Sequence, residues 1–150
     1  MKQFVLLMTL LLGGMAWSCK QGIDYQKSAE THNARIRAAY CTNNILEAEI
    51  YLLADIGTIS EYESNHVKGF DFDMLKARDH ERLFLIYSYL HETNRMSEEY
   101  EKSLEYINLS NRRQGLPPPL RISYDKFSQK VEQAEKNLNV RWKTNDFIQQ

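Results

Sequence analysis

The chain has few of the residues that build disulfide frameworks, tight turns and catalytic loops. Its 150 residues include two cysteines, three prolines and six glycines. Two cysteines are too few for a disulfide-stabilised scaffold. So few glycines leave little room for the glycine-rich loops that cradle phosphate groups. These shortages exclude a small disulfide framework and argue against a nucleotide-binding loop.

An excess of one charge sign is also missing. Lys and Arg total 19 and Asp and Glu total 20, so the net charge at pH 7 is −1. Both signs are interspersed along the chain, and neither a basic stripe nor an acidic tail stands out. A basic stripe is what draws a protein to nucleic acid. We therefore expect no nucleic-acid partner.

No apolar run is long enough to cross a membrane. Residues 4–12 are almost all apolar, but a spanning helix needs about 20 such residues. Lys2 precedes this run, and the small residues Ala16 and Ser18 follow it. A basic start, a short apolar core and a small-residue cleavage site are the parts of an export signal. We predict that residues 1–18 are a signal peptide.

The segment Met15-Ala16-Trp17-Ser18-Cys19 resembles the lipobox of bacterial lipoproteins. In that family a small residue precedes a cysteine that is acylated and becomes the mature N-terminus. The resemblance implies that Cys19 carries acyl chains, which anchor the protein at a membrane surface. Residues 19–27 would then be an N-terminal tether between the anchor and the folded part.

A second interpretation of the same cleavage site stays open. Ala16 and Ser18 also satisfy the small-residue rule of an ordinary signal peptidase, which would release a secreted or soluble periplasmic protein. In that case Cys19 and Cys41 could form a disulfide in an oxidising compartment. If Cys19 is lipidated instead, Cys41 is expected to be a buried small hydrophobic residue.

Beyond the signal, helical periodicity dominates. The spacing of apolar residues predicts one long helix that begins near residues 28–31 and ends near Gly57, with Ile59 just beyond it. Its expected inward face is Ala34, Ala38, Cys41, Ile45, Ala48, Leu52 and Ile56. Leu46, Ile50 and Leu53 widen this apolar surface in a way that suits packing in a bundle.

Two more helices are expected after a connecting loop at residues 60–72. The second runs from about Asp73 to Glu92, and the third has Ser97 as its N-cap and ends before Gly115. Inward positions of the second are Leu75, Leu83, Ile86 and Leu90. Its charged residues are expected to point mostly outward, and these are Lys76, Arg78, Asp79, Glu81 and Arg82.

A proline-rich linker precedes a fourth helix. Pro117-Pro118-Pro119 cannot continue a helix, so this stretch is expected to be a stiff spacer, with a docking ridge as the alternative. Ser123 is the expected N-cap, and the inward residues are Phe127, Val131, Ala134 and Leu138. The predicted fold is therefore all-α, a small bundle of about four helices, with residues 28–150 as a single domain.

Part of this pattern resembles a tetratricopeptide repeat. Leu83, Tyr87, Tyr100 and Ser103 fall at spacings of the large and small positions of that repeat. A stacked groove needs about three repeats, and no second copy is present. The resemblance therefore implies a single helical hairpin.

Histidine spacing gives no metal site. His80 and His91 lie 11 residues apart, which places them about 16 Å apart along one helix, too far to share an ion. His32 and His66 have no Cys or His partner at zinc spacing. We therefore predict no metal and no cofactor.

The acidic pairs also lack a catalytic context. Asp79 with Glu81, and Glu98 with Glu99, fall on helix turns expected to be exposed, where charge usually serves solubility. The chain contains no nucleophile elbow and no phosphate loop. We predict that the protein is not an enzyme.

Aromatic residues supply the candidate binding surface. Tyr87, Tyr89, Tyr100 and Tyr106 fall on the second and third predicted helices, and tyrosine gives amphipathic contact area to an interface. We expect at least half of them to pack in the core and the rest to contact a partner.

The sequence therefore predicts an exported, lipid-anchored helical binding or accessory protein of the bacterial cell envelope, facing the periplasm or the cell surface. Its partners would be the membrane, through Cys19, and a protein of the envelope. One alternative is a periplasmic immunity or inhibitor protein that neutralises a toxin or hydrolase. Another is a small envelope enzyme.

Overall fold

The computed structural model describes residues 24, 27–39, 44–65 and 67–137. Within these residues every regular element is a helix and no strand occurs. The predicted all-α class is therefore confirmed. Cys19, Cys41, His66 and Leu138 lie outside the described residues, so their lipidation, pairing and packing stay predictions.

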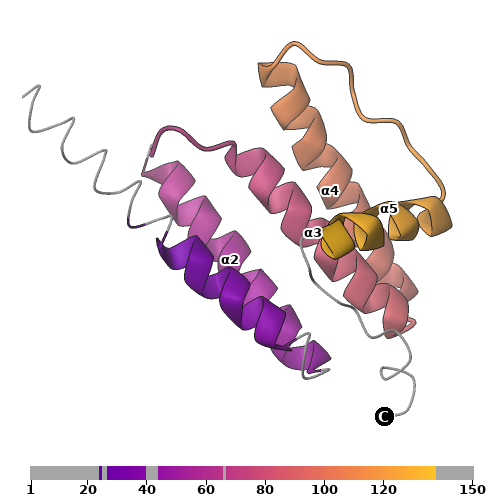
Figure 1. Cartoon of the computed structure of the whole chain (residues 1–150). Helices are drawn as coiled ribbons and strands as arrows, with labels where there is room; N and C mark the ends of the chain where they lie inside the picture. Colours follow the sequence, from indigo (N-terminus) through magenta and orange to yellow (C-terminus); the bar gives the residue numbers. More distant parts are fainter. Residues whose placement is uncertain (1–23, 25–26, 40–43, 66, 138–150) are drawn as a thin grey trace, which may run out of the picture.

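The single long helix predicted at the start of the fold is wrong, because two helices occupy this region. Residues 27–39 form one helix, and α2 spans Ile45–Ser64. The two lie side by side in Figure 1. Asn44 begins α2 as its N-cap, with its side-chain oxygen accepting a hydrogen bond from the Glu47 N–H at 3.2 Å. Asn is preferred at the N-cap because its short side chain accepts a hydrogen bond from a backbone N–H that has no partner within the helix.

The division changes which residues face the core. Ala34 and Ala38 were expected to be buried but are exposed, whereas Ile36 and Ala39 are each 1% exposed. A spacing pattern that runs across two helices does not predict which residues are buried, because each helix packs on the core with its own face. Ala48 and Leu52 of α2 are buried, as predicted.

Gly57 does not end α2. It lies within the helix, which continues to Ser64 and carries Ile59 into the core beside Val67 and Phe72. Glycine inside a helix costs about 1 kcal/mol relative to alanine. Packing of Ile59 outweighs that cost, which the sequence pattern could not show.

The central element is α3, which spans Phe72–Tyr89 and contacts α2, α4 and α5. Residues 83–87 are all buried, each with at most 2% of its surface exposed. Five consecutive buried positions cover every side of a helix, because successive residues turn by about 100°. Figure 1 shows α3 between α2 and α4, with α5 lying across the pair formed by α3 and α4.

α4 spans Thr93–Arg113 and runs back along α3. Its N-cap is Glu92, and Ser97, the predicted N-cap, lies inside the helix. The turn is tight because His91 adopts a left-handed backbone conformation with φ of 57°. The C-terminus agrees better with expectation, since Gly115, with φ of 69°, follows the last turn.

α5 spans Tyr124–Asn137 and begins directly after the predicted cap, Ser123. Phe127 and Val131 pack on α3 and α4, with the Phe127 ring 4.8 Å from both the Phe84 and the Tyr100 rings. Ala134 was predicted to face inward but is exposed.

Candidate functional site

Charged residues of α3 that were predicted to face solvent are buried. Lys76 is 6% exposed, Asp79 2% and Arg82 8%, whereas Arg78 is exposed as expected. The reason is the central position of α3, which leaves little of its surface without a neighbouring helix. Buried charges are costly unless they are paired, so each of these residues should have a partner.

Five of the buried or part-buried ionisable residues meet in one group, here called the polar core cluster. Its members are His32, Asp55, Asp79, Arg82 and Glu135, which come from the helix at 27–39, α2, α3 and α5.

Short contacts form two groups within the cluster. Nδ1 of His32 lies 2.8 Å from Oδ1 of Asp55. Arg82 bridges the other two acids, with Nη1 3.3 Å from Oδ1 of Asp79 and Nε 2.9 Å from Oε1 of Glu135. Glu135 is 4% exposed and takes the inward place that Ala134 was expected to have. Arg82 also donates to Asn33 of the helix at 27–39 at 3.4 Å, so the cluster joins four helices by polar contacts.

Asp79 favours its protonated form. Burial raises the pKa of Asp79 to about 8, Arg82 opposes the rise, and the neighbouring Asp55 adds to it. Within the described residues, Oδ2 of Asp79 has no hydrogen-bond partner. Two ionised carboxylates can only accept hydrogen bonds. A proton on Asp79 therefore gives the pair of Asp79 and Asp55 the hydrogen-bond donor that it would otherwise lack.

The cluster borders a cavity of about 60 Å³, lined in part by Asn33, Asp55, Asp79 and Arg82. A water molecule has a share of liquid volume of about 30 Å³. The cavity thus has room for water but not for an organic substrate. Across the described ranges, no group of three or more His, Cys, Asp or Glu residues is arranged to hold a metal ion. The chemistry available here is the holding of a proton.

A second buried contact between ionisable side chains joins α3 to α4. Nδ1 of His80 lies 2.5 Å from Oε2 of Glu99. The Tyr106 ring stacks on the His80 ring, with 5.4 Å between the two ring centres. Glu99 also accepts a hydrogen bond from Lys102 at 2.8 Å. Burial acts to raise the pKa of Glu99, but the bonds from His80 and Lys102 outweigh it and lower the pKa.

The expectation that Asp79 and Glu99 lie on exposed helix turns is therefore wrong. Both are buried, with 2% and 5% of their surface exposed. Alternating charge along a helix is typical of a solvated face, but here neighbouring helices cover that face. Arg82 of the same helix pairs with Asp79, and His80 of the neighbouring helix contacts Glu99.

The four tyrosines do not form one exposed aromatic surface. Tyr87 and Tyr100 are core residues, 2% and 3% exposed, so neither contributes accessible area to a partner. The Tyr87 hydroxyl donates to Glu49 at 2.7 Å, and the Tyr89 hydroxyl donates to Glu132 at 2.9 Å. Tyr89 and Tyr106 are partly exposed, and their role in partner binding stays a prediction.

Apolar surface is instead exposed on α2. Leu46, Ile50 and Leu53 are 68%, 63% and 49% exposed, although they were expected to suit packing in a bundle. Their spacings of four and three residues place them on one side of the helix, and we call them the α2 outer stripe. The opposite side of α2 is the one that packs on the core, through Ala48, Leu52 and Ile59.

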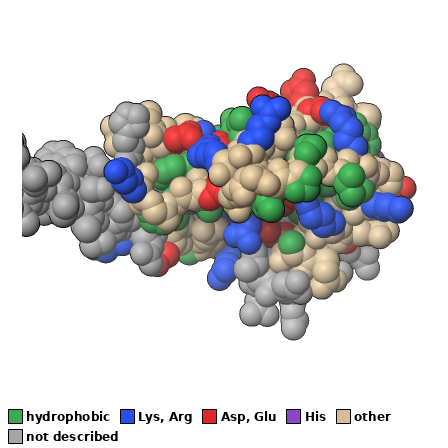
Figure 2. All heavy atoms as spheres, turned by 90° about the horizontal axis from the view of Figure 1, so that it is seen from above, with side chains coloured by type: hydrophobic (Ala, Val, Ile, Leu, Met, Phe, Trp, Pro, Cys, Tyr) green, Lys and Arg blue, Asp and Glu red, His purple; other side chains and the backbone are tan. Residues whose placement is uncertain are grey.

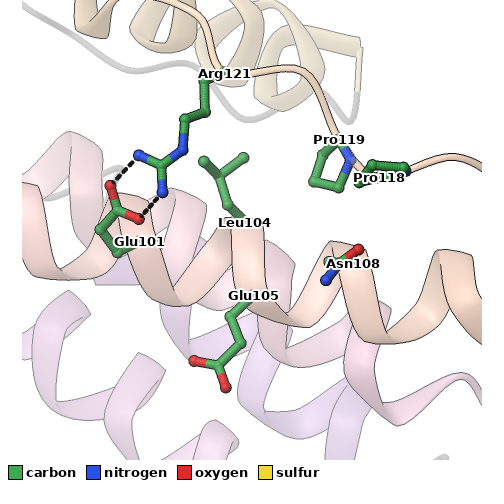
Figure 3. A pocket seen from close by; sticks show the side chains of 7 residues that line it. All are labelled: Glu101, Leu104, Glu105, Asn108, Pro118, Pro119 and Arg121. Carbon is green, nitrogen blue, oxygen red and sulfur yellow. Dashed lines mark hydrogen bonds and ion pairs between the residues drawn. The ribbon is translucent and has the colours of Figure 1, made fainter.

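A groove of about 380 Å³ lies between α4 and the proline-rich linker (Figure 3). Arg121 crosses it and pairs with both carboxylate oxygens of Glu101 at 2.6 Å. This ion pair satisfies two of the charged groups of the groove, and Glu105 and Asn108 also line it. Figure 2 shows Lys and Arg side chains interspersed with Asp and Glu on the face that it presents.

No family model, curated protein or solved structure matches this chain. In the part of the chain that the structure describes, none of the helices combines the length and the apolar character needed to cross a bilayer. The site must therefore be interpreted from its own geometry.

Proposed function

We propose that this protein is an exported, lipid-anchored binding or accessory protein of the bacterial cell envelope, built as a small helical bundle. Its partner-contact surface is the α2 outer stripe. The single observation that carries the binding role is the exposure of Leu46, Ile50 and Leu53 on one side of one helix. Single exposed apolar residues are normal, but an aligned group on one element is typical of an interaction site.

The polar core cluster supports the same proposal indirectly. Its charged groups bind one another, and the cavity beside them has room for water alone. A role in holding the helices together accounts for every contact that the cluster makes. Tyr87 and Tyr100 are too buried to belong to this surface, and partner contacts by Tyr89 and Tyr106 remain a separate prediction.

The anchor is tested by the intact mass of the mature protein from membrane and soluble fractions. We expect a membrane-bound species that begins at Cys19 and is heavier by a diacylglycerol and an acyl group. Cys19→Ala should abolish both the added mass and the membrane association. An unmodified soluble protein, lighter by the two hydrogens of a Cys19 to Cys41 disulfide, would contradict lipidation and favour a diffusible inhibitor.

The binding role is tested by placing a photoreactive amino acid at Ile50 in cells. We expect irradiation to give one discrete adduct with another envelope protein, because Ile50 lies in the middle of the stripe. The matched control carries the same probe at Leu120, which is 86% exposed on the linker, and should give none. Absence of an adduct at Ile50, or the same adducts at both positions, would contradict the proposed function.

A further inference from the structure

We infer that the α2 outer stripe receives an amphipathic helix of another protein, whose apolar ridge is flanked by Lys or Arg. This inference rests on the proposed function and names the partner class of the same surface. Two features of α2 carry it, the linear shape of the apolar surface and the charge beside it.

The shape favours a helix as the occupant. Leu46, Ile50 and Leu53 form a narrow ridge along α2, and Gly57 continues the same line four residues later. A Cβ atom built on Gly57 would meet nothing within 4 Å, so this end of the ridge is open and flat. Because the distance between packed helices depends on the side chains at the contact, a glycine lets a partner helix approach closely. Apolar residues spaced three and four positions apart are typical of helices that bind another helix through one face.

The charge favours a basic occupant. The α2 sequence contains acidic residues but no Lys or Arg. Glu47 precedes Ile50 by three residues and Glu61 follows Gly57 by four, so both lie beside the ridge. Glu61 is exposed and Glu47 is partly exposed. Complementary charge at the rim of an interface sets orientation and partner choice.

The cations that come close to α2 from neighbouring helices are already engaged. Arg95 pairs with Glu49. The Arg35 guanidinium carbon lies 5.8 Å from the centre of the Tyr51 ring. Lys76 pairs with Glu63 at 2.5 Å, and none of these cations pairs with Glu47 or Glu61. Among the described residues, Glu47 accepts side-chain hydrogen bonds only from the uncharged groups of Asn44 and Tyr51, so its negative charge is not balanced. The acidic groups next to the ridge therefore remain the ones that a docked helix would meet.

The same charges disfavour the other occupants of such a ridge. Two copies of α2 packed through their ridges would each bring acidic residues and no Lys or Arg to the contact, so the helix offers its copy no opposite charge. An anionic lipid surface would be repelled by the same acidic residues. A helix with Lys or Arg beside its apolar face meets neither penalty.

The test measures binding of two synthetic amphipathic peptides to the purified full chain carrying Cys19→Ala. Each peptide has about 15 residues, since shorter isolated helices are marginal in water, and both have the same leucine face. One has Lys beside this face and the other has Glu. By fluorescence anisotropy we expect the Lys peptide to bind at least about tenfold more tightly, equivalent to about 1.4 kcal/mol.

Variants on α2 locate the contact. Ile50→Ser should weaken the Lys peptide about tenfold, and Glu61→Lys should reduce or reverse the preference between the two peptides. Glu61 lies in the last turn of α2, where a cation is favourable, so Glu61→Lys is expected to fold. The matched control, Glu105→Lys on the exposed side of α4, should change neither affinity.

Three outcomes would overturn the inference. These are equal affinity for both peptides, equal effects of Glu61→Lys and Glu105→Lys, or a dimer in sedimentation that Ile50→Ser dissociates. If the photoreactive probe at Ile50 still gives its adduct in cells, such a result rejects the basic-helix partner alone. If the probe gives no adduct, the proposed function itself fails.

Discussion

Replacing Asp79 by Asn is expected to stabilise the protein at pH 8 and to leave its stability at pH 4 almost unchanged. Burial raises the pKa of Asp79 to about 8, whereas an unfolded chain ionises Asp near pH 4. Between these values the unfolded state loses its proton first, so the free energy of unfolding of the natural protein falls as pH rises. Asn removes the ionisation but still offers an N–H to Asp55 and an oxygen to Arg82.

Chemical denaturation of both proteins from pH 4 to pH 8 measures this effect. We expect the difference in the free energy of unfolding to grow with pH to a few kcal/mol, since one pKa unit corresponds to about 1.4 kcal/mol. Carboxylates whose pKa is lowered, such as Glu99, are common to both proteins and cancel in the difference. Glu98→Gln, at an exposed position of α4, is the control and should run parallel to the natural protein. Parallel curves for Asp79→Asn would contradict the assignment of a protonated Asp79.

Removing Arg82 is expected to be among the most destabilising single changes in this chain. Arg82 is 8% exposed and bridges Asp79 and Glu135, which are themselves buried. Without the guanidinium, Glu135 must be protonated or stay charged in a poorly solvated place. Asp79, already protonated near neutral pH, loses a hydrogen-bond donor. Removing one partner of a buried ion pair typically costs about 3–5 kcal/mol. Thermal and chemical denaturation of Arg82→Met should show a loss of this size.

Two further variants separate the loss of charge pairing from the loss of packing. Arg78→Met lies one turn earlier on α3 and is exposed, so we expect its stability to change by less than about 0.5 kcal/mol. In the triple variant, Arg82→Met is combined with Asp79→Asn and Glu135→Gln, which removes the uncompensated charge of Glu135 and the ionisable group of Asp79. It should recover much of the lost stability, because uncharged replacements of a buried ion pair are often neutral or stabilising. If the triple variant is as unstable as Arg82→Met, then packing of the arginine side chain is what matters.

The helix ends show most clearly which features of the fold the sequence predicts. Gly115 and the three prolines after it stop α4, and Ser123 precedes α5, as local rules predict. The same rules fail at the first helix, where Asn44 begins a new helix inside a continuous apolar pattern. Capping by Asn is a local interaction. Whether the chain begins a new helix at Asn44 or continues the first one depends on how residues 27–39 pack against α2, and no local sequence pattern predicts that packing.

The sequence by itself determined that the described part of the chain is all-helical and where its proline-rich break falls, while the export signal at residues 1–18 and acylation of Cys19 stay predictions. Periodicity and turn residues act over a few positions, so one chain suffices to show them. Only the tertiary structure decided which face of each helix is covered. Because α3 lies at the centre, Asp79 and Arg82 are buried although they are charged, while Leu46 and Ile50 remain exposed although they are apolar.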